Sequence, residues 1–573
     1  MNYDIVITGA GLAGLSLARH LLLYTSKTVL LLDKRSELPG STQKVGESLV
    51  QLSGFYLGKV LDLEEHLQLN HYLKYNLRFQ WKTCGANTNL EDYSCSFIRL
   101  GSNIPTYQLD RNLLESHLLD LNKRNPRFRL ASGVRDLAVE FSKDGDHLVR
   151  YLGQEVRCRW FVDSSGRGGF LKRKLGLERK NTIRHGSTWC WVDGLVNIEK
   201  LTDKPKAIVI NNVDRRKQGH FPFFLATNHF CDEGMWFWVI PLHGKTSLGL
   251  VYEHRVLSPN EVSNARKMLE YVCRKWPLFQ RDLPNRKVLD EGRFFDYSYD
   301  VEQSISPDRW ALTGEAARFS DPLYSPGSDL IAIHNTLILN AIEAGDRRAL
   351  ESKCSLFEEI MRVMYESFVP SYAVSYDCLG DQEAYTLKYT WELAIYFGFF
   401  VVPFINSLFA DERFMLFHLR KYSILGPINR NLQQFLSAFF HWKKKQGMRT
   451  TRHMIDFYEM LPLCRSEKLF YEIGLVREEA ETVIEKQTEQ LKEFARYIIA
   501  HVHAVVLNDR NVLLNAPFVS GLKLRNTAFD PEKMRAAYAP YADSPKRYEW
   551  KHLDPFALDP YLSCREAAVE VGV

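Results

Sequence analysis

The segment Asp4-Ile-Val-Ile-Thr-Gly-Ala-Gly-Leu-Ala-Gly14 decides the fold of this chain. It predicts a short buried strand that runs directly into a glycine-rich turn and then into a helix. Gly9 permits the tight turn, Gly11 lets a pyrophosphate approach the backbone, and Gly14 lets the helix pack closely on the strand. The amino terminus of the helix then faces the phosphates. The segment therefore predicts a dinucleotide-binding βαβ unit.

The second strand of this unit ends in an acid. Residues 28–32 are largely apolar, and Asp33 follows them. Lying about 20 residues beyond the glycines, Asp33 is suited to accept hydrogen bonds from a ribose 2′-OH. A carboxylate at this point disfavours a 2′-phosphate, so we expect FAD or NAD rather than NADP.

Two later turns also follow apolar strands. Trp160-Phe-Val-Asp-Ser-Ser-Gly-Arg-Gly168 contains Asp163, and the segment from Ala311 continues into Gly314 and Glu315. With the opening turn they make three separated loops that can converge on one extended cofactor. The third loop continues as a turn that is bent by the residues Pro322, Pro326 and Gly327.

Proline fixes φ and glycine lacks a Cβ, so the turn at residues 319–328 can bring main-chain groups close to a ligand. We therefore interpret it as a second grip on the cofactor. Taken alone, the same composition also fits a tight strand-to-helix connection without a ligand.

The remaining composition is ordinary for a globular protein. The 573 residues are 45% hydrophobic and 25% charged, and the formal net charge of +5 gives no indication of a nucleic-acid partner. Ten scattered cysteines without a Cys-x-x-Cys pair predict no metal site. The apolar run at residues 393–409 is shorter than the roughly 20 residues of a membrane span, so we expect a buried helix and no transmembrane segment. The start of the chain shows no secretory signal, which favours a cytoplasmic location with reduced thiols.

With these three turns, the chain resembles the FAD-dependent aromatic-ring hydroxylase superfamily. The marks of that superfamily are the glycine-rich turn, an Asp-Gly turn in mid-chain and a late Gly-Asp turn. Gly314 is followed by Glu315 where the superfamily has Asp, and the longer carboxylate could still reach the ribitol side of FAD. Arg111 heads a segment like the one that carries the superfamily's flavin-proximal arginine, although a surface arginine is nearly as good an interpretation.

Four further motifs are similar to those of the flavin-dependent halogenases. Trp236-Phe-Trp-Val-Ile-Pro241 fits the signature Trp-x-Trp-x-Ile-Pro at every fixed position, and Lys44-Val-Gly-Glu-Ser48 resembles the loop beside the flavin. The pattern Phe-x-x-Pro-x-x-Ser-x-Gly is matched at Phe319, Pro322, Ser325 and Gly327. Lys74-Tyr-Asn-Leu-Arg-Phe-Gln-Trp81 keeps the Lys, Phe and Trp of Lys-x-Gly-Ala-x-Phe-x-Trp but has Asn76 and Leu77 in place of Gly-Ala. The resemblance covers about residues 1–350.

The resemblance implies a role for each matched residue. It makes Lys74 the catalytic residue. It assigns to the cofactor the residues Gly9, Gly11, Gly14, Asp33, Gly46, Glu47, Ser48, Arg111, Asp163, Gly314, Glu315, Pro322 and Gly327. It assigns to the surroundings of halide and substrate the residues Ser325, Pro326, Trp81, Trp236 and Trp238. Without the resemblance, Lys74 would be taken for a solvated lysine and the two strand tryptophans for one face of a sheet.

The resemblance also implies the chemistry. Reduced FAD and O2 would form a flavin hydroperoxide, halide would attack it, and the hypohalous acid would travel to Lys74, which delivers halogen to an electron-rich aromatic substrate. That substrate could be a free small molecule, a peptide or a carrier-bound group. A separate flavin reductase would supply reduced FAD, because no second nucleotide motif is present. Two alternatives stay open: a flavin monooxygenase on the same scaffold, and a flavin-binding protein without turnover.

Pro326 is the main departure from the halogenase pattern. In that family, backbone N–H groups of the Ser-x-Gly turn hold the halide. Proline has no N–H, so one expected donor is missing. A hydrogen bond to a charged group contributes about 1.5–3 kcal/mol, so halide binding could weaken by roughly one to two powers of ten.

The sequence therefore predicts an α/β (α+β overall) protein in two parts. Residues 1–350 would form a Rossmann-like FAD-binding core with an antiparallel substrate sheet at about residues 180–290. Residues 351–573 would form a helical domain that covers the substrate. In this second part the apolar residues recur at helical spacing and predict one amphipathic helix, with a buried face made of Ala480, Ile484, Leu491, Phe494, Ile498, Val502 and Val505.

Overall fold

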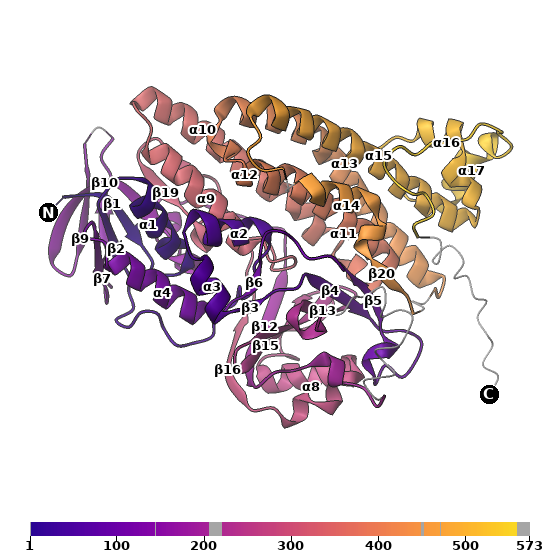
Figure 1. The fold of residues 1–573 in the computed structure, drawn as a ribbon, viewed down its shortest axis with the longest axis horizontal. Coiled ribbons are helices and arrows are strands. Elements are labelled where there is room, and N and C mark those ends of the chain that lie inside the picture. The colour runs from indigo at the N-terminus through magenta and orange to yellow at the C-terminus, as the bar shows by residue number, and fades with distance from the viewer. Residues whose placement is uncertain (1, 144, 205–220, 449–451, 470–471, 559–573) are drawn as a thin grey trace.

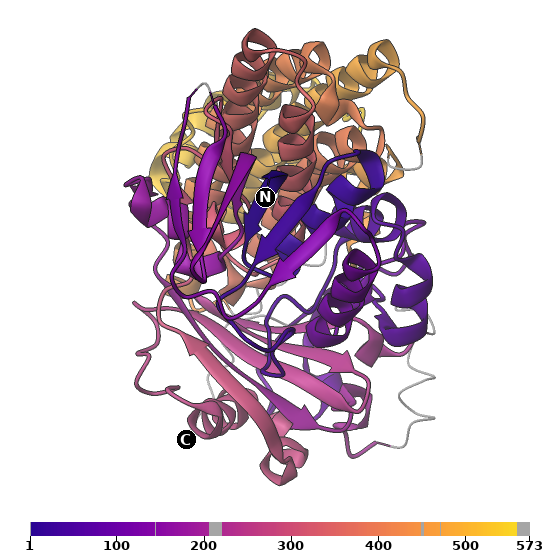
Figure 2. The ribbon, with the colours of Figure 1, turned by 90° about the vertical axis from the view of Figure 1, so that its left-hand side faces the viewer.

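The computed structural model describes residues 2–143, 145–204, 221–448, 452–469 and 472–558. Two large sheets lie beneath a layer of long helices, as Figures 1 and 2 show from two directions. The first sheet carries the glycine-rich turn, and the second carries the tryptophan motif.

The first sheet contains the predicted βαβ unit. β1 (Asn2–Thr8) pairs in parallel with β2 (Val29–Leu32) and β10 (Gln154–Asp163), and α1 (Leu12–Tyr24) connects β1 to β2. The strand order is β18-β19-β10-β1-β2-β7, and β8 and β9 extend from β10. The outer strands are β7 (Phe128–Ala131), β8 (Ala138–Glu140), β9 (His147–Tyr151), β18 (Ile305–Ser306) and β19 (Trp310–Leu312).

Alternate residues of β1 enter different cores. Ile5 and Ile7 pack into the core that contains α1, whereas Val6 packs into a separate core with residues of β9 and β10. The strands of a parallel sheet that is buried on both faces are continuously apolar in sequence. This explains why apolar and polar side chains do not alternate at residues 5–7. Helix α1 also contacts α4 (Arg111–Lys123) and α9 (Gly327–Ile342).

The glycine-rich turn packs against the turn that follows β10. Gly9 has φ +104°, and a Cβ on it would lie 2.3 Å from the carbonyl oxygen of Ser164. A Cβ on Gly14 would lie 2.0 Å from the carbonyl oxygen of Gly9. A Cβ on Gly11 would meet no atom within 4 Å. Close packing of the chain on itself therefore requires two of the three glycines, and the third faces open space.

The second sheet has eight strands in the order β16-β12-β15-β14-β13-β4-β5-β20. These are β4 (Leu77–Trp81), β5 (Ser94–Phe97), β12 (His185–Asp193), β13 (Thr227–Asp232), β14 (Met235–Leu242), β15 (Lys245–Glu253), β16 (Val288–Phe294) and β20 (Met454–Asp456). The expected antiparallel sheet is present, but it is not purely antiparallel, because β13 pairs with β4 and β5 pairs with β20 in parallel. It also recruits strands from well outside residues 180–290.

β14 is buried on both faces. Trp236 and Trp238 point to the main core, whereas Phe237 and Val239 enter the core beneath α8 (Ala265–Lys275). The alternation places both tryptophans on the face of the sheet that looks toward the rest of the molecule.

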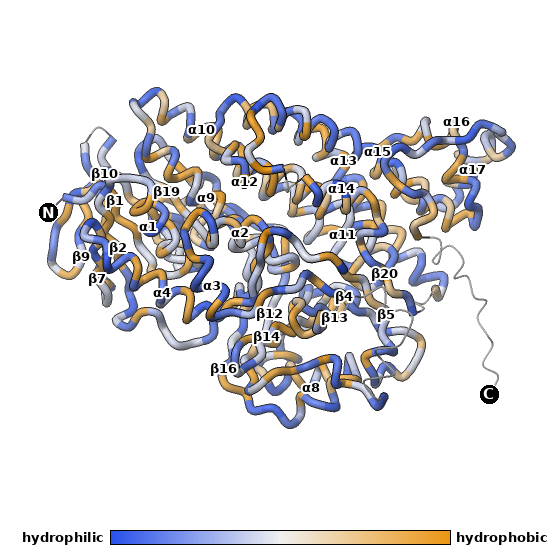
Figure 3. Tube along the Cα trace, in the orientation of Figure 1, coloured by the Kyte–Doolittle hydropathy of each residue, from blue (hydrophilic) through white to orange (hydrophobic). Residues whose placement is uncertain are grey.

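The third layer is helical. Its elements are α10 (Arg347–Ala373), α11 (Gln382–Tyr396), α12 (Val402–Ile405), α13 (Glu412–Lys445), α14 (Leu461–Lys468), α15 (Arg477–Leu507), α16 (Ala516–Gly521) and α17 (Pro531–Tyr538). The expected boundary at residue 350 falls inside α10. Figure 3 shows hydrophilic and hydrophobic residues alternating along α13 and α15, as in helices with one buried face. The predicted apolar face of α15 is buried.

The apolar run at residues 393–409 is a largely buried helical segment, as predicted; Tyr396 and Asn406 are partly exposed and Ser407 is exposed. It is interrupted by a π-helical turn at Phe397–Val401, between α11 and α12. No helix in the described ranges combines the length and the apolarity needed to cross a bilayer.

The different surroundings of Gly14 and Gly11 predict different effects on stability when each is replaced by alanine. Gly14→Ala should lower the free energy of unfolding of the ligand-free chain by about 1–3 kcal/mol, because the methyl group overlaps a backbone oxygen. Gly11→Ala has free space for its methyl group, so the same urea titration should change by less than about 1 kcal/mol. Equal destabilisation of the two variants would contradict this account of the turn.

Candidate active site

An open cleft of ≈ 890 Å³ lies at the carboxyl ends of β1 and β2. Ligands of open α/β sheets bind at this edge. Thr8, Gly9, Asp33, Ser165 and Gly168 are among its lining residues. The cleft therefore joins the glycine-rich turn to the turn after β10.

Asp33 is held by the protein itself. Its Oδ2 accepts a hydrogen bond from the Ala10 N–H at 2.6 Å, and Arg35 donates from Nε to Oδ1 and from Nη2 to Oδ2, both at 3.0 Å. Burial raises the pKa of Asp33, but these hydrogen bonds outweigh burial and lower the pKa below its usual value. Arg35 also lines the cleft and was missed from the sequence. An arginine two residues after the acid was the available signal.

Asp163 does not line this cleft. Its side chain is fully buried, and its two carboxylate oxygens accept hydrogen bonds from the N–H groups of Ser165 at 2.8 Å and Leu171 at 2.7 Å. The acid that sequence reasoning assigned to the cofactor thus holds its own turn, and Ser165 and Gly168 supply the surface.

A second cavity, here called the middle cavity, lies between the two sheets and the start of α9. Its volume is ≈ 130 Å³, close to that of an engineered cavity of about 150 Å³ that binds benzene. It brings together the predicted residues Gly46, Glu47, Ser48, Arg111, Trp236, Trp238, Gly314, Glu315, Pro322, Ser325 and Gly327.

Glu47 connects the middle cavity to the second sheet. Its Oε1 accepts the Trp191 indole N–H at 2.6 Å, and its Oε2 accepts the Ser247 hydroxyl at 2.7 Å. The Ser247 oxygen in turn accepts the Trp238 indole N–H at 3.1 Å. Burial raises the pKa of Glu47 to about 7, although the two hydrogen bonds act in the opposite direction. The carboxyl group can therefore be protonated near neutral pH.

Arg111 is the first residue of α4 and is fixed on the loop that carries Glu47. Its Nη1 donates to the Val45 carbonyl oxygen at 2.8 Å, and its Nε donates to Glu115 at 3.1 Å. Glu115 is fully buried and also accepts a hydrogen bond from Lys44 at 2.7 Å. The guanidinium group therefore lines the cavity with its position already determined.

The turn that follows β19 is the wall between the middle cavity and a third, inner cavity. Tyr324 and Pro326 line the inner cavity, while Ser325 and Gly327 line the middle one. Tyr324 and Ser325 adopt φ values of +69° and +61°, and such non-glycine conformations cost of order 1–3 kcal/mol each. Pro326 precedes the first residue of α9 with φ −75°, which suits proline. The N–H groups of the next residues begin the helix and have no partner within it.

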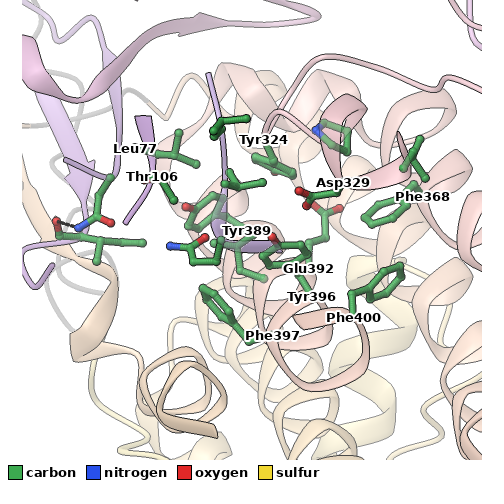
Figure 4. Close-up of a pocket in the computed structure, with 18 of the residues that line it drawn as sticks. Leu77, Thr106, Tyr324, Asp329, Phe368, Tyr389, Glu392, Tyr396, Phe397 and Phe400 are labelled. Carbon is green, nitrogen blue, oxygen red and sulfur yellow. Dashed lines mark hydrogen bonds between the residues drawn. The ribbon is translucent and has the colours of Figure 1, made fainter. Parts of the chain in front are cut away.

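The inner cavity has a volume of ≈ 50 Å³ and is lined mainly by aromatic and aliphatic side chains. In Figure 4, Leu77 and Thr106 lie on one side of it, and Asp329, Glu392, Phe368 and Phe400 lie on the other. Lys74 is part of its lining. This cavity thus contains the residue that the resemblance makes catalytic.

Lys74 is buried, and its Nζ donates to the Leu49 carbonyl oxygen at 2.7 Å. Burial lowers the pKa of Lys74 to about 7, and the nearby Asp329 only partly offsets the effect. Burial also raises the pKa of Asp329 to about 6, although Asp329 accepts the Ser53 N–H at 2.8 Å. Asp329 was not predicted as a site residue, because it is separated from Lys74 by most of the nucleotide-binding core.

Two residues of the Lys74 motif differ in their surroundings. Asn76 has φ +60°, a conformation that glycine and asparagine tolerate best, so the substitution of Gly by Asn preserves the backbone at that position. Trp81 lines neither cavity. Its indole N–H donates to the Leu379 carbonyl oxygen at 2.8 Å, and its ring packs near Tyr385. The structure therefore gives Trp81 packing contacts away from the predicted halide and substrate surroundings.

A buried polar cluster behind the wall was missed from the sequence. Asp321 accepts hydrogen bonds from the Tyr297 hydroxyl at 2.7 Å and the Tyr376 hydroxyl at 3.2 Å, and it lies 2.7 Å from His185 Nδ1. Burial lowers the pKa of His185, but Asp321 and Glu253 outweigh burial and raise it. These five residues come from five separate segments without a shared motif. Within the described ranges, no group of three or more His, Cys, Asp or Glu side chains is arranged to hold a metal ion.

This geometry agrees with the relationships of the chain. The family model for tryptophan halogenase matches residues 100–378. Flavin-dependent halogenase chlA of Dictyostelium discoideum is 25% identical over 360 residues, which cover 58% of this chain and 58% of that protein. The chain is therefore similar in sequence to the flavin-dependent halogenases.

Other halogenases are similarly distant from this chain. Tetracycline 7-halogenase of Kitasatospora aureofaciens is 27% identical over 371 residues, covering 59% of this chain and 62% of that halogenase. The chain therefore covers about three-fifths of the length of these two halogenases. The 1H-pyrrole-2-carbonyl-[peptidyl-carrier protein] chlorinase of Pseudomonas fluorescens is 25% identical over 345 residues, covering 57% and 72%. The crystal structure of halogenase PltM has the same fold, with a TM-score of 0.61 over 85% of this chain and 96% of that chain at 16% identity.

The raised pKa of Glu47 predicts a pH-dependent stability. Between pH 4.5 and about 7 the folded chain keeps a proton that the unfolded chain has lost, so this group lowers the free energy of unfolding as pH rises through that window. Glu47→Gln removes the titration, keeps an acceptor for the Trp191 N–H, and turns the contact with Ser247 into one in which the amide N–H donates to the hydroxyl oxygen. Its stability relative to the wild-type chain should therefore increase with pH, by at most about 3 kcal/mol.

Urea titrations of the ligand-free protein at pH 5 and pH 8 measure this effect. The surface variant Glu155→Gln serves as the control and should show no comparable change between the two pH values. A stability difference for Glu47→Gln that does not vary with pH would argue against a proton on Glu47 in the folded chain.

Proposed function

We propose that this protein is a flavin-dependent halogenase that binds FAD and halogenates an electron-rich aromatic substrate. The observation that carries the proposal is the surroundings of Lys74, a buried lysine with a pKa of about 7 in a cavity behind the wall formed by residues 322–329. The family's named members support the same chemistry, since they act as halogenases.

The residues fit an FAD molecule. The open space above Gly11 suits a pyrophosphate, and the cleft beside Asp33 and Arg35 suits an adenosine. The middle cavity has the apolar walls that a flavin ring requires, with Arg111 at its edge. When reduced and bound, FAD supplies the oxidising power of O2 that converts halide into an electrophilic halogen. We propose that a separate flavin reductase delivers it in reduced form.

Lys74 is suited to receive that halogen. At a pKa of about 7 both of its forms are populated near neutral pH. The ammonium form can donate a hydrogen bond to hypohalous acid, and the amine form can accept the halogen directly. Trp236 and Trp238 line the middle cavity, where they would exclude substrate from the flavin and so favour halogenation over direct hydroxylation.

The substrate is proposed to be an electron-rich ring, either free or attached to a carrier. Tetracycline 7-halogenase and the pyrrole-2-carbonyl-carrier chlorinase represent both kinds among the relatives. A flavin monooxygenase is the second candidate, and the observation that favours it is Pro326, which removes one N–H from the turn expected to hold halide.

Incubation with FAD, a flavin reductase, NADH and bromide separates the two candidates. A brominated phenol, or brominated monochlorodimedone, supports the halogenase. A hydroxylated product that forms without halide supports the monooxygenase and overturns the proposal.

Lys74→Ala should reduce halogenation by about 10²–10⁴-fold, the usual contribution of a positioned acid or base. Binding of FAD should not change, because Lys74 lines the inner cavity rather than the nucleotide cleft. Lys82→Ala is the matched control, since Lys82 lies eight residues further on, is partly exposed and pairs with Asp232 at 3.5 Å. Product formation by Lys74→Ala at the wild-type rate would eliminate Lys74 as the catalytic residue.

Pro326→Ser restores an N–H at the start of α9. If the missing donor limits halide binding, the KM for bromide should fall by roughly 10- to 100-fold. Steady-state rates at a series of bromide concentrations measure the change. An unchanged KM would show that halide does not depend on this position.

A further inference from the structure

The inner cavity contains a carboxylate oxygen without a partner. Glu392 lies on α11, where every residue from Gln382 to Ile395 is buried, and its own exposure is 6%. Its Oε1 accepts hydrogen bonds from Lys388 and from Gln433, the latter at 3.0 Å. Its Oε2 has no hydrogen-bond partner in the part of the chain that the structure describes. Glu392 is among the residues that line the cavity (Figure 4).

The carboxylate is rigidly supported. Lys388 is completely buried and pairs with Glu392 one helical turn away. The Gln433 amide also donates to Asn429 at 3.0 Å, and Asn429 accepts the Trp391 indole N–H at 2.9 Å. A network of this kind fixes the position of the free oxygen before any ligand arrives.

Leaving a buried acceptor unpaired is costly, of order 1–3 kcal/mol and more for a charged group. Such groups in native proteins call for a specific explanation. Lys388 already balances the charge of Glu392, so neutrality alone does not require the second oxygen to be free.

A second polar group in the same wall is also unpaired. The Tyr389 hydroxyl has no partner among the described residues, and Tyr389 lies three residues before Glu392, on the same side of α11. Tyr389 can donate one hydrogen bond, and Glu392 can only accept. A hydroxyl group satisfies both, because it donates to a carboxylate and accepts from a tyrosine. A ring N–H satisfies only the carboxylate.

The rest of the lining suits the ring that carries such a hydroxyl. Phe368, Tyr372, Phe397 and Phe400 line the same cavity as the two polar groups. The volume of ≈ 50 Å³ accepts the hydroxyl edge of a ring, whereas a whole benzene occupies a cavity of about 150 Å³. Phe397 and Phe400 therefore have to move aside, and both lie on the π-helical turn, an irregularity that is frequent at functional sites.

We propose that Glu392 determines substrate specificity by accepting a hydrogen bond from a phenolic hydroxyl, while Tyr389 donates to the same oxygen. The inference rests on the proposed function and names the substrate class of its inner cavity. Accepting that hydrogen bond also raises the electron density of the ring and so favours attack on an electrophilic halogen. Glu392 lies beyond the segment that matches the family model.

The first test uses the wild-type protein and two ligands of similar size, phenol and anisole. Binding is measured by isothermal titration calorimetry, without turnover, so its outcome does not depend on halogenation. Phenol should bind about 10- to 100-fold more tightly, because anisole leaves Glu392 without a donor. Equal affinities, tighter binding of anisole or no binding of either ligand would overturn the inference.

The second test uses Glu392→Gln, with Glu383→Gln as the control. Glu383 is a buried acid on the same helix that pairs with Lys443 and His501 and does not line the cavity. Glu392→Gln should lose the preference for phenol, and Glu383→Gln should keep it. If Glu392→Gln does not fold, the double variant Lys388→Met with Glu392→Gln removes the uncompensated cation. A preference for phenol that survives in a folded variant overturns the inference.

Bromination of monochlorodimedone distinguishes a failure of the proposed halogenase activity from a failure of the proposed role of Glu392. This trap reports formation of the halogenating agent, so for Glu392→Gln the ratio of kcat/KM for phenol to the rate with the trap should fall about 10- to 100-fold relative to the wild-type protein. A wild-type protein that binds phenol selectively but brominates nothing refutes the proposed function and leaves Glu392 as a phenol-binding residue. Equal loss of both activities would refute the role of Glu392 in specificity.

Discussion

The buried carboxylate of Asp321 joins the parts of this protein that its site depends on. It contacts His185 at the start of β12, Tyr297 after β16 and Tyr376 between α10 and α11, and its Oδ1 accepts the Leu323 N–H at 2.9 Å. Residues of the second sheet, the helical layer and the wall between the cavities therefore all contact the same carboxylate. Because the partners satisfy the carboxylate from several directions, the strained backbone at Tyr324 and Ser325 can be held in place.

Burial sets the chemistry on both sides of that wall. It raises the pKa of Glu47 to about 7 and that of Asp329 to about 6, and it lowers the pKa of Lys74 to about 7. The ordinary pKa values of two acids and a lysine lie on opposite sides of pH 7. Burial shifts all three toward neutral pH for the same reason, because the charged form of each group loses its surrounding water. Perturbed pKa values of this kind cluster at functional sites. Here the three groups line the two cavities on either side of the wall.

The sequence was sufficient for features that depend on local pattern. The βαβ unit, the burial of residues 393–409 and the apolar face of α15 follow from glycine spacing and apolar periodicity, and the structure confirms them. Most residues assigned to the flavin and halide surroundings share the middle cavity, although their roles stay predictions.

Features that depend on long-range contacts were not accessible. Asp163 follows a strand like a ligand-binding acid, yet the backbone of its own turn uses both oxygens. Asp321 matters through partners that lie far away in the sequence. Glu392 matters through an oxygen that has no partner among the described residues. Glu392 gave one weak signal, as a charge within a stripe of aromatic residues on a wholly buried helix. The parallel pairing of β5 with β20 had no signal at all, because the two strands are separated by most of the second sheet and by α10 to α13.

That distant pairing has a consequence for the synthesis of the chain. β5 is complete at residue 97, and among the described residues the strand that pairs with its outer edge is Met454–Asp456. While the ribosome makes the intervening segment, the sheet has an open edge, and open edges promote pairing with other chains. A fragment that stops near residue 350 would keep that edge permanently. The second sheet is therefore complete only after β20, a strand of three residues, has been translated long after β5.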